Sequence, residues 1–179
     1  MCLTLTSNWK ENTEFYQSLD KPFVAWKVFR VDSIYKHHCT VNSVFRYYKW
    51  KNGVNVSDRA NKKITDSEIR NQMVYAGIHS FLEYEDAIEC FHRFWNSIVL
   101  PVKIFPKDVV ATGIFFNKKS IVANKVTIRF NKELITKIIP TSMMHIQNRP
   151  LSSKKQNILD YCQEIVAKWN LAWETSVKE

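Results

Sequence analysis

The sequence predicts a single α+β domain whose sheet is mostly antiparallel, with one central helix and an amphipathic C-terminal helix packed on the sheet. Three observations favour this class. The chain has 179 residues, which suits one domain spanning 1–179. Its 45% hydrophobic and 13% aromatic content is sufficient for a folded core and excludes full disorder. Strand-like segments are interrupted by two helical patterns, and the chain contains no internal repeat.

Strands are predicted for segments that are rich in β-branched and aromatic residues and are bounded by turn-forming residues. These segments are residues 23–31, 41–50, 98–105, 109–116 and 120–130. The short connections between the last three favour antiparallel pairing. Side chains alternate along a strand, so Lys125, Thr127 and Arg129 should share one face of the last segment.

Two helices are predicted because apolar residues recur at three- and four-residue spacing. The first covers residues 83–95, and its acidic first turn suits the positive end of the helix dipole. The second covers residues 152–177, and its wide apolar stripe favours packing on the sheet. Residues 55–72 are polar and should form an exposed loop or a short helix, since Thr65-Asp66-Ser67-Glu68 matches a capping box.

The N-terminus and the cysteines argue against several classes of protein. Residues 1–10 lack the basic and apolar regions of a secretory signal, and no apolar run has the length of a membrane span. We therefore expect a cytoplasmic protein of a bacterium or an infected host cell, without membrane contact. The four cysteines form no C-x-x-C pair, and adjacent residues of His37-His38-Cys39 would point to opposite faces of a strand. No metal site is predicted.

Positive charge is concentrated in one part of the chain. The formal net charge is +9, and residues 101–150 hold nine basic residues against two acidic ones. This asymmetry favours an acidic macromolecular partner, either nucleic acid or an acidic protein surface. The alternative is a solubilising surface of lysines. The partner-binding residues predicted in this part are Lys103, Lys107, Lys118, Lys119, Lys125 and Arg129.

Aromatic and basic residues also alternate over residues 45–50. Arg46 and Lys49 could hold phosphates while Tyr48 and Trp50 stack on bases. The alternative is a sheet edge whose cations extend to solvent.

One segment offers candidate catalytic residues. The chain has three glycines and lacks the motifs of P-loop, Rossmann, zincin and α/β-hydrolase enzymes. Gly77-Ile78-His79-Ser80-Phe81 leads into the predicted helix, where His79 could transfer a proton and Ser80 could line a cleft. The alternative is that His79 packs in the core beside Phe81.

The order of several segments resembles a loosely defined group of small uncharacterised phage and bacterial proteins. The segments are Met1-Cys2-Leu3, VAWKVFR at 24–30, GIHSF at 77–81, EDA at 85–87, VLPVKIFPKDVVATGI at 99–114 and SIVANKVTI at 120–128. The resemblance covers roughly residues 1–130. It implies a phage or bacterial origin and the same α+β order.

A second similarity is to the split-sheet fold of the ADP-ribosyltransferases. In that family a first-strand Arg or His, a Ser or Tyr after a middle strand and a late Glu hold and activate NAD. By order along the chain, the similarity implies a transferase site with Arg30, Ser80 and Glu133 as catalytic residues and NAD as cofactor. His79 would lie in the same cleft. Without this activity, no cofactor is expected.

Overall fold

The computed structural model describes residues 2–35, 38–43, 49–59, 63–91, 97–131, 160 and 162–167. The strands are β1 (Leu3–Thr4), β2 (Phe23–Tyr35), β3 (His38–Ser43), β4 (Gly53–Val56), β5 (Met73–Val74), β6 (Ile78–Phe81), β7 (Ser97–Ile104), β8 (Val109–Phe115), β9 (Lys118–Ala123) and β10 (Lys125–Ile128). The helices are α1 (Trp9–Gln17), α2 (Asp66–Arg70) and α3 (Tyr84–Phe91), and a 3-10 turn, η1, covers Pro106–Asp108.

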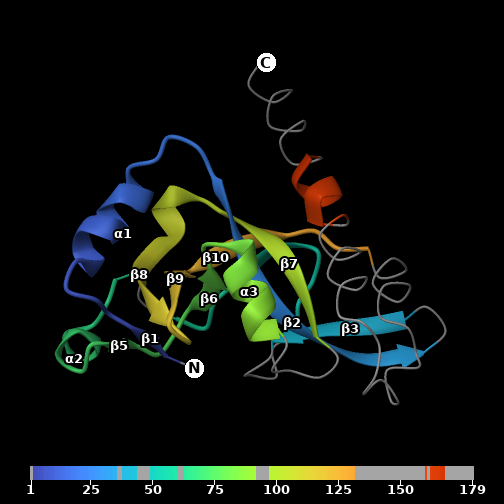
Figure 1. The fold of residues 1–179 in the computed structure, drawn as a ribbon, viewed down its shortest axis with the longest axis horizontal. Helices are drawn as coiled ribbons and strands as arrows, with labels where there is room; N and C mark the ends of the chain where they lie inside the picture. Colours follow the sequence, from blue (N-terminus) through green and yellow to red (C-terminus); the bar gives the residue numbers. More distant parts are fainter. Residues whose placement is uncertain are drawn as a thin grey trace.

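All the strands belong to one sheet, and every pairing between them is antiparallel (Figure 1). The strand order is β4-β10-β7-β2-β6-β9-β8-β1-β5, and β3 pairs with β2 off this path. The predicted single, mostly antiparallel sheet is therefore confirmed.

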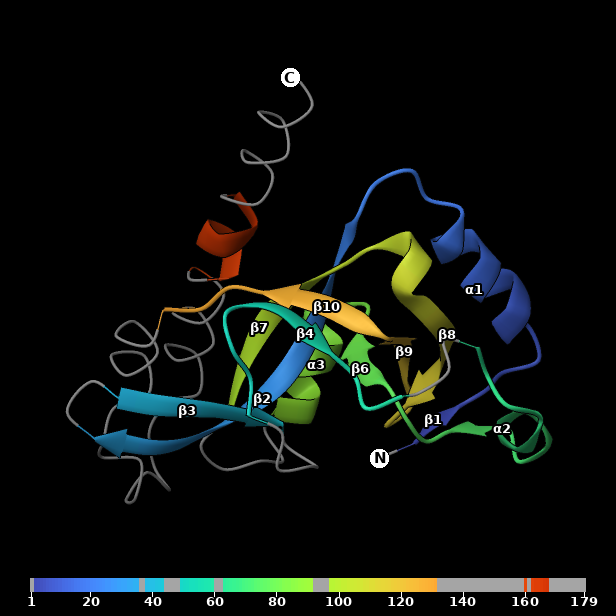
Figure 2. The same cartoon turned by 180° about the vertical axis from the view of Figure 1, so that it is seen from behind.

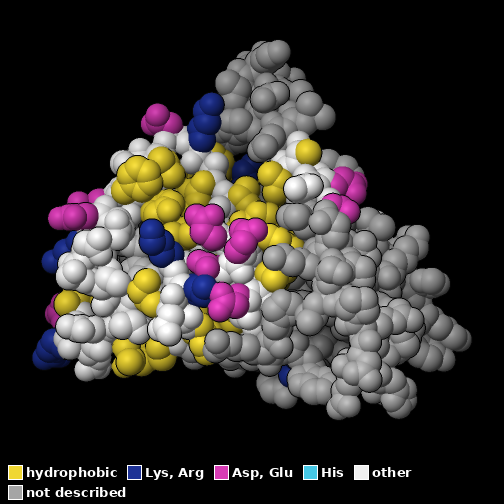
Figure 3. Space-filling model, viewed as in Figure 1, with side chains coloured by type: hydrophobic (Ala, Val, Ile, Leu, Met, Phe, Trp, Pro, Cys, Tyr) yellow, Lys and Arg dark blue, Asp and Glu magenta, His cyan; other side chains and the backbone are white. Residues whose placement is uncertain are grey.

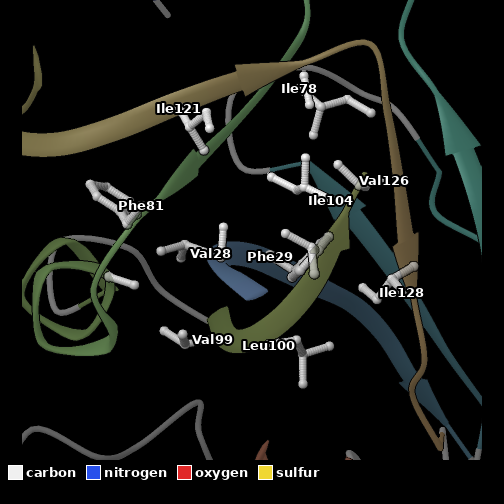
Figure 4. Close-up of a cluster of buried hydrophobic side chains, with 14 of the residues drawn as sticks. Val28, Phe29, Ile78, Phe81, Val99, Leu100, Ile104, Ile121, Val126 and Ile128 are labelled. Carbon is white, nitrogen blue, oxygen red and sulfur yellow. The ribbon is translucent and has the colours of Figure 1, made fainter. Parts of the chain in front are cut away.

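The strand order is linear, and the chain itself joins two separate places in it at Asn124. This residue alone separates β9 from β10, yet β9 pairs with β6 and β8 whereas β10 pairs with β7 and β4. Since β2 pairs with both β6 and β7, the strands β2, β6, β9, β10 and β7 form a circuit, which the chain at Asn124 completes without a β9–β10 pairing; we call this circuit the ring. Figure 4 shows buried hydrophobic side chains from these five strands gathered in one cluster. Buried residues of the ring include Phe29, Ile78, Leu100, Ile104, Ile121, Val126 and Ile128.

The prediction of one strand over residues 120–130 is wrong, because Asn124 interrupts it. The backbone N–H of Asn124 donates to the carbonyl oxygen of Asp108, and its own carbonyl oxygen accepts from Ser57 N–H, both at 2.8 Å. These bonds occupy the backbone of Asn124 with partners outside the adjoining strands. After inward-facing Ala123, regular alternation would place the next inward side chain at residue 125, but it is at Val126. The inward-facing positions therefore shift by one residue at Asn124, where the chain passes from one part of the ring to the next.

The predicted helix over residues 83–95 is confirmed in part as α3, while residues 92–95 lie outside the described ranges. Its buried residues include Tyr84, Ala87 and Ile88. Tyr84 packs edge-on against Trp26 of β2, with ring centroids 5.0 Å apart. The helix therefore covers one face of the sheet formed by β2, β6 and β7 (Figure 1).

Helix α1 was not predicted. It packs on the core through Trp9 and Tyr16, and the Tyr16 ring lies 5.0 Å from that of Phe23 in β2. Thr13 is its only buried residue. The hydroxyl of Thr13 accepts a 3.0 Å hydrogen bond from the backbone N–H of Thr112 in β8, and Gln17 Nε2 donates to the carbonyl oxygen of Val109 at 3.0 Å. The packed face has helical spacing at Trp9, Thr13 and Tyr16, but its buried central residue is polar, which weakens the apolar pattern in the sequence.

The capping box predicted within residues 55–72 is confirmed at the start of α2. Thr65 Oγ1 accepts from Glu68 N–H, and the Glu68 carboxylate accepts from Thr65 N–H at 3.0 Å. The segment 55–72 does contain a short helix, α2, as expected, although β4 covers its first two residues and Glu68 is buried. Arg59 binds the Glu68 carboxylate with two nitrogens, at 2.6 and 2.9 Å.

The part of the predicted helix 152–177 that the structure describes is helical and packs on β7. Cys162 and Ile165 are buried, and Cys162 Sγ lies 3.2 Å from the carbonyl oxygen of Val99, to which it donates. The rest of that prediction lies outside the described residues. Over the described ranges, no helix has both the length and the apolar character that a membrane span requires.

We expect Glu68→Gln to lower the free energy of unfolding by about 3 kcal/mol at pH 7, because it leaves the buried Arg59 without its carboxylate. The Arg59 hydrogen bonds hold the pKa of Glu68 at about 2, below the usual 4.5. A carboxyl whose folded pKa is depressed stabilises the protein above its unfolded pKa and loses that effect as the pH falls. The difference between variant and wild type should therefore shrink from pH 5 towards pH 3.

Urea denaturation at several pH values measures both effects. Glu14→Gln, at an exposed position of α1, is the matched control and should change stability little. Equal stability of the two variants at pH 7 would contradict the role assigned to Glu68.

Candidate functional site

A row of paired residues crosses four strands on the outer face of the sheet. Val54 of β4 pairs with Thr127 of β10, and Thr127 pairs with Lys103 of β7. Lys103 in turn pairs with Val24 of β2. Residues directly opposite one another on antiparallel strands project to the same face. The four side chains therefore lie side by side.

Two further cations flank this row on β10. Lys125 pairs with Val56, and Arg129 follows Thr127 at the next outward position. Lys125 and Arg129 are exposed, whereas the residues between them at 126 and 128 are buried, as the predicted alternation requires. We call this surface the cationic face and define it as Val54, Val56, Lys103, Lys125, Thr127 and Arg129.

The cations of this face are held near one another. Lys103 lies opposite Thr127, and Arg129 is two residues further along the chain. Burial lowers the pKa of Lys103, and the positive charge of Arg129 lowers it further. The strands β4, β7 and β10 contain no Asp or Glu, and the first acidic residue after β4 is Asp58. Val54 and Val56 are 51% and 50% exposed beside the cations. The face thus combines positive charge with accessible apolar surface.

The opposite side of the molecule is acidic. In Figure 1 α3 lies in front of the sheet, and Figure 3 shows Asp and Glu side chains gathered over it. Seen from behind in Figure 2, β4 and β10 lie in front instead. Lys118 belongs to the acidic side, because its Nζ lies 3.3 Å from Asp86 Oδ1 and 2.5 Å from Glu89 Oε2. These contacts raise the pKa of Lys118, with the Glu89 hydrogen bond contributing most.

The other basic and aromatic candidates are dispersed. Lys107 is exposed in η1, and Lys119 is exposed in β9 beside the β8–β9 turn. Lys49 is exposed and pairs with Asn42 in an isolated bridge. Arg46 and Tyr48 lie outside the described residues. The structure therefore brings together three of the predicted cations, Lys103, Lys125 and Arg129. The other predicted basic residues that it describes lie elsewhere on the molecule.

Trp50 needs a correction, because stacking on a base requires an accessible ring. It is only 5% exposed, and its ring packs edge-on against Phe29 with centroids 5.1 Å apart. Its backbone N–H donates to the carbonyl oxygen of Val41 at 2.8 Å. Trp50 is therefore part of the core.

The candidate catalytic residues on β6 are also buried. His79 is 6% exposed and lies near the Phe115 ring, at 6.2 Å between centroids, while Ser80 is 2% exposed. A substrate would reach either residue only after the chain rearranged. This placement matches the alternative in which His79 packs in the core.

The residues implied by the ADP-ribosyltransferase similarity do not converge in the described part of the chain. Trp26 and Phe81 are paired and share a face, so Arg30 lies on the Trp26 face of β2 and Ser80 on the opposite face. Glu133 lies outside the described residues.

Lys27 is a feature that the sequence analysis missed. It is 5% exposed, on the face of β2 that points into the ring with Ala25 and Phe29. Its Nζ donates to the carbonyl oxygen of His79 at 2.8 Å and lies 5.4 Å from the Trp50 ring centroid. Burial lowers its pKa to about 8. The sequence did contain a signal for this burial, because Lys27 shares one strand face with the apolar residues Ala25 and Phe29.

Ser80 lies opposite Lys27 across the β2–β6 pairing. The paired residues Trp26 and Phe81 set this register, and the next position on each strand is Lys27 and Ser80. The Ser80 hydroxyl is buried and has no hydrogen-bond partner. The ring interior therefore contains a local polar site among aliphatic side chains.

No three His, Cys, Asp or Glu side chains in the described ranges are grouped so that they could hold a metal ion. Cys2, Cys90 and Cys162 are free thiols. Comparison of the chain with models of protein families, with curated proteins and with solved structures finds no match. The two resemblances noted in the sequence stay predictions.

We expect Lys27→Met to be at least as stable as wild type at pH 7, because it removes a buried charge and keeps the side-chain volume. Above about pH 8 the folded wild type favours the neutral amine, whereas the unfolded chain keeps its proton up to about pH 10.5. Wild-type stability should therefore rise between about pH 8 and pH 10, by about 2–3 kcal/mol.

Urea denaturation of both proteins at pH 7, 8, 9 and 10 checks this result. The difference between them cancels the titration of tyrosines and cysteines, so the rise assigned to Lys27 should be absent from the variant. A variant that tracks wild type at every pH would refute the assignment.

Proposed function

We propose that this chain is a small intracellular binding protein that docks an acidic macromolecule on the cationic face. The observation that carries the proposal is the strand register: Lys103 pairs with Thr127, and exposed Lys125 and Arg129 lie two residues to either side of Thr127. Like charges side by side on a sheet destabilise the fold. A polyanion bound across them would replace this repulsion with attraction and release its own counterions.

The surroundings of these charges support docking over general solubilisation. On a solubilising surface, charges of both signs are interspersed. Here the strands of the face contribute cations without carboxylates, and half-exposed Val54 and Val56 adjoin them. Exposed apolar side chains beside a group of cations are typical of a contact surface.

The charge difference between two sides of the molecule orients the approach of an acidic partner. The acidic residues over α3 lie on the side away from β4 and β10 (Figures 2 and 3). An acidic partner is repelled from that side and attracted to the cationic face. Such fields orient encounters and accelerate association at low ionic strength.

We expect Lys125→Glu and Arg129→Glu each to weaken polyanion binding by about tenfold or more at about 50 mM salt. Each should also lower the slope of log K against log salt by about 1. Two fluorescent probes are suitable: an oligothymidine of about 20 nucleotides and a poly-glutamate of equal charge. Fluorescence anisotropy measures both affinities.

Lys119→Glu is the matched control, since it makes the same charge change at an exposed position beside the β8–β9 turn. It should weaken binding much less than the two face variants. The proposal fails if neither probe binds, or if the control weakens binding as much as Lys125→Glu does.

A further inference from the structure

We propose that the partner of the cationic face is a single-stranded nucleic acid that runs along β10. This inference rests on the proposed function and specifies its ligand. It depends on the spacing of the three cations and on one aromatic ring, Phe105, at the edge of the face.

The cations are spaced as a single strand requires. Lys125 and Arg129 are outward residues four positions apart on an extended segment, which separates their Cα atoms by about 14 Å. Thr127 lies halfway and offers a hydroxyl at about 7 Å from each, a separation comparable with that of successive phosphates in an extended strand. Lys103 lies on the neighbouring strand, opposite Thr127. Lys125, Thr127 and Arg129 are therefore regularly spaced along the chain, so that each could contact one of three consecutive phosphates.

Phe105 places an aromatic ring beside these charges. Its backbone is extended, with φ −86° and ψ 139°, so its side chain projects on the same side of the chain as Lys103. Lys103 Nζ lies 5.9 Å from the ring centroid, which confirms that the two side chains are neighbours. Continuing the β7–β10 register by two residues puts Phe105 opposite Lys125. The ring is half-buried and leaves part of its surface accessible.

A cation beside an accessible ring favours a nucleic acid over an acidic protein. Bases stack on aromatic rings while lysines hold the adjoining phosphates, the arrangement that sheet surfaces use to bind single strands. A carboxylate side chain contributes charge alone and gains nothing from stacking. A duplex keeps its bases stacked internally, so Phe105 would not reach a base face without unstacking it.

The experiment compares three ligands of equal charge: oligothymidine, its duplex with oligoadenine, and poly-glutamate. Wild type should bind oligothymidine about tenfold or more tightly than either of the others. Phe105→Leu should weaken oligothymidine binding about tenfold and leave poly-glutamate binding unchanged, because it removes only the stacking surface. Phe105→Tyr keeps the ring and should retain the wild-type affinity. Thermal melting verifies that both variants are folded.

The outcomes separate the two proposals. Equal affinity for oligothymidine and poly-glutamate, or tighter binding of poly-glutamate, would overturn the nucleic-acid inference while docking of an acidic partner stands. Tighter binding of the duplex, or an oligothymidine affinity that Phe105→Leu does not change, would also overturn it. Absence of binding to all three ligands would overturn both. If Phe105→Leu fails to fold, the comparison of the three ligands on wild type still decides the inference.

Discussion

The structure depends on Asn124, where the chain itself completes the circuit of strands. One continuous segment supplies two strands that lie at different places in the strand order. The break lets β9 pair with β6 and β8 while β10 turns to pair with β7 and β4. Without it, residues 118–128 would form one long strand with one set of neighbours. The circuit therefore creates both the aliphatic interior of the ring and the outward orientation of the β10 cations.

The same circuit gives the molecule two electrically different sides. The residues of β10 alternate between the ring interior and the solvent, and the outward ones are basic or polar. Helix α3 covers another part of the ring with acidic residues, where Lys118 is engaged by Asp86 and Glu89. Strand pairing thus selects, from a stretch of chain already rich in basic residues, the three cations that share one surface. A surface of this kind selects partners by sign of charge and orients their approach.

The fold stabilises buried charge in two different ways, one at the Arg59–Glu68 pair and one at Lys27. Arg59 and Glu68 bind each other, and nearby backbone groups satisfy their remaining donors and acceptors, including the carbonyl oxygen of Ala76 and the N–H of Tyr75. A buried pair of this kind anchors the chain between β4 and β6. Lys27 lies among aromatic rings with a backbone carbonyl as its acceptor. Its burial leaves the charged form disfavoured, so the core carries a group that titrates within the accessible pH range.

Local patterns in the sequence determined those features whose cause lies within a few residues. The alternation around Thr127 predicted the outward face of β10, the residues from Thr65 to Glu68 predicted the start of α2, and the apolar spacing after Glu83 predicted α3. Each depends on backbone periodicity or on a side chain that bonds a near neighbour. Such causes are visible in one stretch of chain.

Contacts between distant residues were decided only by the tertiary structure. Thr13 meets Thr112, and Lys27 meets the carbonyl oxygen of His79. Lys103 and Arg129 become neighbours only because β7 pairs with β10, which a count of basic residues along the chain could not show. The sequence by itself determined which side chains point outward from a strand. The pairing of strands determined which of them share a surface, because register is set by the packing of the whole sheet rather than by any one segment.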